Sequence, residues 1–111
     1  MLSLSYLSKI KEVFSKKVYV CGDGERGQLG LGNRNERRSP TELSLGSERI
    51  KSVSCGSFHT VFLTTKGKVY GCGHSANGEL GTTISRSIPT LIPVQKVKYV
   101  ACGFARTVFL V

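Results

Sequence analysis

The chain has 111 residues and carries 16 Lys and Arg against 7 Asp and Glu, which gives a formal net charge of +9. This length suits one small domain and excludes a multidomain enzyme. Hydrophobic residues make up 40% of the chain, enough for a core, yet no apolar run approaches the roughly 18 residues of a membrane span. With 13 glycines and 3 prolines, the composition favours many tight turns and therefore an all-β fold.

Residues 1–17 differ in pattern from everything that follows. Leu2, Tyr6, Ile10 and Val13 fall at helical spacing, with lysines on the other faces. We therefore predict a short, basic, amphipathic helix here, packed on the edge of a sheet. A targeting leader and a helix that binds a partner remain as alternatives.

The rest of the chain is an internal repeat of about 50 residues. The string V-Y-V-C-G at residues 18–22 returns as V-Y-G-C-G at 69–73, and G-Q-L-G at 27–30 returns as G-E-L-G at 78–81. The string T-V-F-L then occurs in both copies, at residues 60–63 and 107–110. Because every block keeps its order, the chain contains two copies of one unit.

Each copy contains four runs rich in Val, Ile, Tyr, Phe and Thr, as strands do. Lys66-Gly67 provides a tight turn between the copies. Four strands in about 50 residues are typical of a propeller blade, so we predict two four-stranded blades, 18–68 and 69–111, the second truncated in its last strand. The expected strands are 18–22, 41–45, 50–55 and 60–64 in the first copy, and 69–73, 90–94, 97–102 and 107–111 in the second.

The first copy combines several short motifs in a fixed order. They are Tyr19 with Gly22, the run G-Q-L-G-L-G at residues 27–32, Pro40, the pair Cys55-Gly56 and the pair His59-Thr60. This order resembles the repeats of the regulator of chromosome condensation family.

The second copy departs from that pattern in places. Thr82-Thr83 follows Gly81 instead of a second glycine, and Arg106 stands where the first copy has His59. Cys21 and Cys72 lie where the family often has tryptophan.

The resemblance implies a seven-bladed β-propeller, of which this chain would hold two blades. A blade buries its faces against its neighbours, so two blades alone would expose apolar sheet. We therefore expect a fragment or short isoform of a larger propeller protein, or a subunit that needs further blades or self-association.

The resemblance also implies two classes of function. Propellers of this family serve as protein–protein interaction modules, and the best-known member is a guanine-nucleotide exchange factor for a Ran-type small GTPase. Exchange requires a face spanning several blades and an inserted hairpin, so we favour a non-enzymatic interaction module. Part of an exchange factor remains the alternative.

Neither catalytic nor cofactor-binding nor metal-binding residues are expected. The cysteines lie singly, each before a glycine, which suggests small side chains in a sheet core and a reducing compartment, cytoplasm or nucleus. The run G-x-G-x-x-G at residues 22–27 precedes no helix, so it predicts turns and not a nucleotide site. His59 has no nucleophile beside it in sequence, and we expect a structural hydrogen bond across the blade.

The basic residues carry the candidate site. Arg26, Arg34, Arg37 and Arg38 gather in the longest loop of the first copy. Arginine suits carboxylates and phosphates, so we expect a partner protein with an acidic surface, a small GTPase included. A merely solvated basic loop is the alternative. No aromatic residues alternate with these arginines, so sequence-specific nucleic-acid binding is not expected.

Overall fold

The computed structural model describes residues 17–111. The helix predicted for residues 1–17 therefore lies outside the described residues, except for Lys17, which begins the first strand. No helix in the described part of the chain is long and apolar enough to cross a membrane. The eight strands found there are β1 (Lys17–Gly22), β2 (Arg37–Ser44), β3 (Ile50–Cys55), β4 (His59–Thr64), β5 (Val69–Gly73), β6 (Arg86–Ile92), β7 (Tyr99–Cys102) and β8 (Thr107–Leu110).

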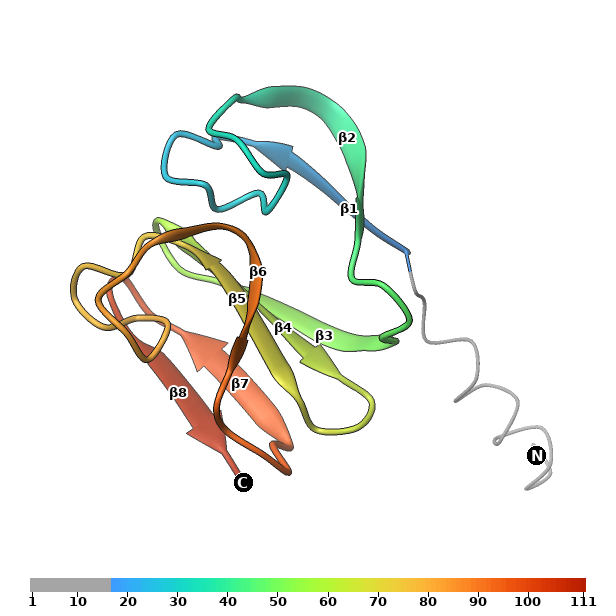
Figure 1. Ribbon diagram of the computed structural model, residues 1–111, viewed down its shortest axis with the longest axis vertical. Helices are drawn as coiled ribbons and strands as arrows, with labels where there is room; N and C mark the ends of the chain where they lie inside the picture. The colour runs from blue at the N-terminus through green and yellow to red at the C-terminus, as the bar shows by residue number, and fades with distance from the viewer. Residues whose placement is uncertain (1–16) are drawn as a thin grey trace, which may run out of the picture.

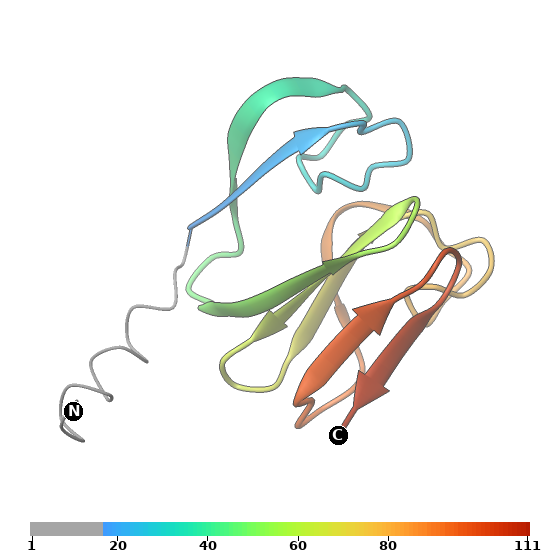
Figure 2. The same ribbon diagram turned by 180° about the vertical axis from the view of Figure 1, so that it is seen from behind.

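These strands form three antiparallel sheets that lie one after another (Figure 1). Strands β3, β4, β5 and β6 form a four-stranded sheet in that order, while β1 pairs with β2 and β7 pairs with β8. Figure 2 shows the β7–β8 sheet beside β3 and β4, and the β1–β2 sheet lies on the other side of the central sheet. The arrangement is a half-blade, a complete blade and a second half-blade.

The complete blade takes two strands from each copy of the repeat. This differs from the expectation that residues 18–68 and 69–111 would each form one blade. The reason is the hairpin that joins the copies: Gly67 has a φ of +79°, and the Thr64 amide donates to the Lys68 carbonyl at 2.9 Å. The hairpin makes β4 and β5 neighbours, so the blade crosses the boundary between the copies.

Strands β2 and β6 begin earlier than expected and contain Pro40 and Pro89, respectively. Proline has no backbone N–H and is tolerated only where the ladder does not need one. Both strands lie at the edge of their sheets, which explains why a proline does not end them.

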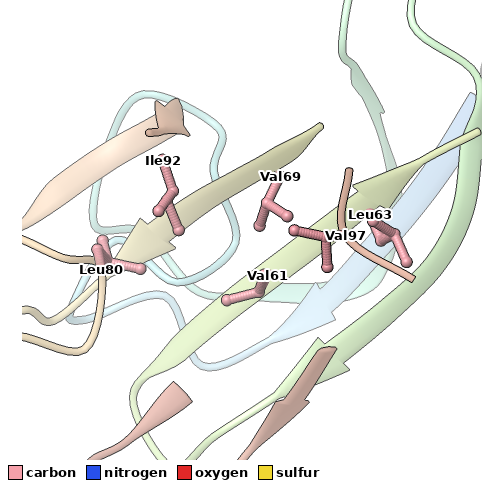
Figure 3. Close-up of a cluster of buried hydrophobic side chains, with 6 residues drawn as sticks. All are labelled: Val61, Leu63, Val69, Leu80, Ile92 and Val97. Atoms are coloured by element: carbon pink, nitrogen blue, oxygen red, sulfur yellow. The ribbon is translucent and has the colours of Figure 1, made fainter. Parts of the chain in front are cut away.

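Strand β4 is buried along its whole length because a sheet covers each of its faces. Its alternate residues Val61 and Leu63 join the main core together with Val69, Leu80, Ile92 and Val97 (Figure 3). Half-buried side chains of β7 and β8, among them Val100 and Phe109, pack against this cluster. The core therefore ties the complete blade to the β7–β8 sheet.

A second apolar cluster lies on the opposite face of the central sheet. It joins Phe62 and Cys72 of β4 and β5 to Leu43 of β2 and Ile50 of β3. The half-buried Val18 and Val20 of β1 complete it. Because both faces of the central blade are packed in this way, it is the most buried part of the described chain.

Candidate partner-binding site

The loop between β1 and β2 is held in place by backbone contacts with the second copy. Gly27 lies so close to the second copy that a Cβ there would stand 2.9 Å from the Cα of Ser87. The Gly32 amide donates to the Ser87 carbonyl at 2.8 Å. The loop of one copy is thus fixed against the segment that leads into β6 of the other.

A polar hollow of about 260 Å³ opens between these two segments. Three arginines line it, Arg26 and Arg34 from the first copy and Arg86 from the second, and none of the described residues that line it is acidic. Its remaining polar side chains are those of Asn33, Ser85 and Ser87. The surface combines guanidinium groups with neutral hydrogen-bonding groups, which suits an anionic group.

Arg26 is oriented by aromatic neighbours. Its guanidinium carbon lies 4.6 Å from the ring centroid of Phe58, and its Nη1 lies 3.5 Å from Nδ1 of His74. Phe58 in turn meets the exposed Phe104 edge to face at 6.3 Å. Stacking of this kind holds a guanidinium in place while leaving its hydrogen-bond donors available.

Arg86 is the half-buried member of the group. It stands at the start of β6, opposite Gly73 of β5. Its buried Nε has no hydrogen-bond partner among residues 17–111. A buried donor without a partner is costly, and the equivalent Nε of Arg37 in β2, outside the hollow, is in the same state.

The structure separates the four arginines singled out from the sequence. Arg26 and Arg34 meet at the hollow, whereas Arg37 and Arg38 belong to β2 and do not line it. Arg38 is exposed and pairs with Glu36 at 3.2 Å, a type of contact that contributes little.

Sequence reasoning missed Arg86. A signal was available, because aligning Pro40 with Pro89 places Arg86 in the position of Arg37. The two residues also hold equivalent places in the fold, opposite Gly22 and Gly73 in the two sheets.

His59 joins two sheets. Its side chain is buried, and its Nε2 lies 3.0 Å from Oγ1 of Thr107 in β8. The Thr107 hydroxyl donates its one proton to the Glu79 carbonyl at 2.6 Å, so Nε2 must be the donor to Thr107. Burial lowers the pKa of His59 below 6.5, although the Glu79 carboxylate opposes the shift. The contact runs between neighbouring sheets and not within one blade.

The threonine contact occurs in both copies. In the first copy, the Thr60 hydroxyl donates to the Gln28 carbonyl at 2.7 Å, as Thr107 does to Glu79. These bonds attach the G-x-L-G loop of each copy to the last strand of the same copy, which lies in the next sheet. The repeated motif residues are thus the groups that join successive sheets.

The expectation that the cysteines point into the core is confirmed in the second copy of the repeat and not in the first. Cys72 is buried and its thiol donates to the Gln28 carbonyl, and burial raises its pKa to about 12. Cys102 is half-buried. Cys21 and Cys55 are exposed, so the expectation is wrong for them.

Another hollow on the surface is less suited to bind an acidic segment. A larger hollow of about 460 Å³ lies between the β4–β5 hairpin and the β6–β7 loop, but mainly apolar groups and three lysines line it. One of those, Lys68, already pairs with Glu48 at 3.7 Å.

Within residues 17–111, no group of three or more His, Cys, Asp or Glu side chains is placed to hold a metal ion.

The sequence model of the regulator of chromosome condensation (RCC1) repeat matches residues 16–63 and residues 66–110. The chain belongs to the RCC1 repeat family. A second model of the RCC1 repeat matches residues 50–79, which run from β3 through β5 of the complete blade. The three sheets are parts of a β-propeller of the RCC1 type, in agreement with solved structures of RCC1 proteins.

Similar proteins are much longer than this chain. The ultraviolet-B receptor UVR8 of Arabidopsis thaliana is 42% identical over 93 residues, which cover 76% of this chain and 21% of the receptor. The X-linked retinitis pigmentosa GTPase regulator of Canis lupus familiaris is 36% identical over 96 residues, which cover 80% of this chain and 10% of the regulator. The crystal structure of human WBSCR16 superposes with a TM-score of 0.79 at 30% identity, covering 87% of this chain and 26% of that one.

Proposed function

We propose that this chain is a protein–protein interaction module that binds an acidic segment of a partner through the arginine hollow. The observation that carries the proposal is the meeting of Arg26, Arg34 and Arg86, from both copies, in one hollow without an acidic lining residue in the described chain. Guanidinium groups bind carboxylates through paired, charge-assisted hydrogen bonds. Phe104, exposed beside Phe58, offers an apolar contact next to this charge.

In this proposal the module binds a partner and does not catalyse a reaction. Repeats of this family serve as regulators or binding modules, and the hollow contains donors but no nucleophile paired with a base. We also propose a reducing compartment, cytoplasm or nucleus, because the four cysteines are free, with two of them exposed.

A fluorescent peptide of alternating Glu and Gly tests the acidic-partner assignment. We expect its anisotropy to rise on titration with the full chain, and the affinity to fall as salt is added. Arg86→Gln should weaken binding about tenfold, since one charge-assisted hydrogen bond contributes about 1.5 kcal/mol or more.

Arg38→Gln is the matched control, because it removes the same charge outside the hollow. An equal loss in both variants would show a general charge effect and contradict the proposed site. A single-stranded oligonucleotide that displaces the peptide at equal or lower concentration would contradict an acidic protein as the partner.

Part of a guanine-nucleotide exchange factor is the second candidate. It is favoured by the similarity to a protein named as a GTPase regulator, of which this chain spans only 10%. Exchange activity predicts that the chain accelerates release of a labelled guanine nucleotide from a Ran-type GTPase. Release at the spontaneous rate, from a chain shown to be folded, would exclude this candidate.

A further inference from the structure

Two strands in the half-blades repeat the sequence of the two strands that pair at the centre of the complete blade. The string T-V-F-L of β8 at residues 107–110 is identical to that of β4 at 60–63. The string V-Y-V-C-G of β1 at residues 18–22 differs from that of β5 at 69–73 at a single position. In the complete blade, β4 and β5 are antiparallel neighbours, with Thr60 opposite Cys72 and Phe62 opposite Tyr70.

The equivalent strands each have one edge that no strand of residues 17–111 covers. Within the described residues, β1 pairs only with β2, and β8 pairs only with β7. These strands also have an uncovered apolar face: Val61 of β4 is fully buried, whereas its equivalent Val108 in β8 is 58% exposed. Tyr19 of β1 and Leu110 of β8 are also exposed. An open strand edge with apolar side chains is a ready template for pairing.

We infer that β8 of one chain pairs with β1 of a second copy of the same chain. The register follows from the β4–β5 pair by the repeat, so that Val108 lies opposite Val20 and Phe109 opposite Tyr19. The two half-blades then form one four-stranded blade with the strand order β7, β8, β1, β2. Because β1 and β8 differ, the contact runs head to tail.

The occupant is a second copy because the chain itself contains both halves of the pair. In the inferred pair, the valine, phenylalanine and leucine of β8 lie across from the valines and tyrosine of β1. Phenylalanine faces tyrosine and leucine faces valine in the same way where β4 pairs with β5. Cross-strand pairs of aromatic and β-branched residues stabilise antiparallel sheets. The inferred contact does not involve the arginine hollow, so its test does not depend on the proposed function.

Head-to-tail contacts close into rings when the rotation allows. Residues 17–111 of each copy supply one complete blade and two half-blades, which amounts to two blades. Three or four copies would then form a ring of about six or eight blades, within the size range of propellers. We therefore expect assemblies of three or four chains.

Cysteine cross-linking tests the register directly. In the central pair, Thr64 donates to Lys68 and His74 donates to Phe58, so the pair at Val61 and Gly71 falls between hydrogen-bonded positions. Such positions bring the side chains closest together and suit a disulfide. Their equivalents are Val108 and Val20.

One chain would carry Val20→Cys and a second chain, with a longer tag, Val108→Cys, both with Cys21→Ser and Cys55→Ser. After mixing and mild oxidation, we expect a mixed disulfide to form about tenfold faster than with Phe109→Cys in place of Val108→Cys. The control residue is one position along the strand and points to the other face. Equal rates in the two mixtures would overturn the inferred register.

Light scattering measures the mass of the assembly on the unmodified chain, so the result does not depend on whether a cysteine variant folds. We expect the mass to rise with concentration from one chain to three or four. A mass of one chain at every concentration would overturn the inference. Circular dichroism on the same samples reports whether the strands are formed.

Discussion

The same four residues, T-V-F-L, adopt the same strand conformation in β4 and β8 but meet different surroundings. In β4 every one of them is buried, because β3 and β5 pair on either side and a sheet covers each face. In β8 they alternate between half-buried and exposed, since only one face of the β7–β8 sheet packs on the main core in the described chain. The repeat sequence therefore specifies a strand with two partners and two covered faces. Whether it obtains them depends on the next repeat.

The largest expected effect comes from truncating the same leucine in the two strands. Leu63 is 1% exposed and Leu110 is 58% exposed. We expect Leu63→Ala to lower the free energy of unfolding by about 3 kcal/mol, as for a filled core position. Leu110→Ala should cost less than about 1 kcal/mol in dilute solution. Urea unfolding followed by circular dichroism measures both.

Equal losses in the two variants would mean that β8 is as well packed as β4, contrary to the comparison. A Leu110→Ala cost that grows with protein concentration would instead support the difference between the two strands. Such growth would mean that the second position becomes buried on association.

Glycine at the β3–β4 turn and its equivalent at the β7–β8 turn provide the next test. A Cβ at Gly56 would collide with the His59 ring and stand 2.6 Å from the Gly103 carbonyl, whereas one at Gly103 would meet mainly the side chain of Arg106 at 2.9 Å. The ring is buried and fixed, but the arginine side chain is flexible and exposed. We expect Gly56→Ala to cost about 2 to 3 kcal/mol and Gly103→Ala about 1 kcal/mol, by the same unfolding measurement.

A comparable cost at both glycines would show that the turn backbone and not the histidine ring sets the constraint. Gly56→Val should have a still larger effect than Gly56→Ala, because it adds two methyl groups at the collision. A soluble, cooperatively unfolding Gly56→Val chain would contradict the packing described here.

The smallest change that we expect is a pH dependence of stability that comes from His59, whose place in the second copy is taken by Arg106. Because burial lowers the pKa of His59 below 6.5, the unfolded chain binds a proton more readily than the folded chain below that pH. Stability should therefore be complete above pH 6.5 and decline as the pH falls toward the folded-state pKa. His59→Gln should flatten the profile over that range, measured as urea midpoints. A decline that persists unchanged in this variant would assign the effect to other groups.

Strand positions followed well from the sequence because alternation and β-branched residues mark them locally. The strands β3 and β5 have the expected bounds, β1, β4 and β8 differ by one residue at one end, and β7 begins two residues later than expected. Strands β2 and β6 were expected to start after Pro40 and Pro89 and instead include them, since both are edge strands. Local sequence does not reveal whether a strand lies at an edge.

The grouping of strands into sheets was harder to predict because a repeat has no intrinsic starting point. The tight turn at Lys66-Gly67 was identified from sequence, and its consequence is that β4 and β5 pair across the copies. The candidate site needed the fold as well: Arg26 and Arg86 are far apart in sequence, and the contact of Gly27 with Ser87 brings their segments together.

Hydrogen exchange of the β8 amides, measured at low and high protein concentration, shows whether the free edge of β8 pairs with a second copy. In β4, where both partners are present, residues 60–63 should exchange slowly at every concentration. We expect residues 107–110 to exchange faster in dilute solution and to slow toward the β4 rate as the concentration rises. Exchange of β8 that is independent of concentration would contradict pairing of its open edge with a second copy.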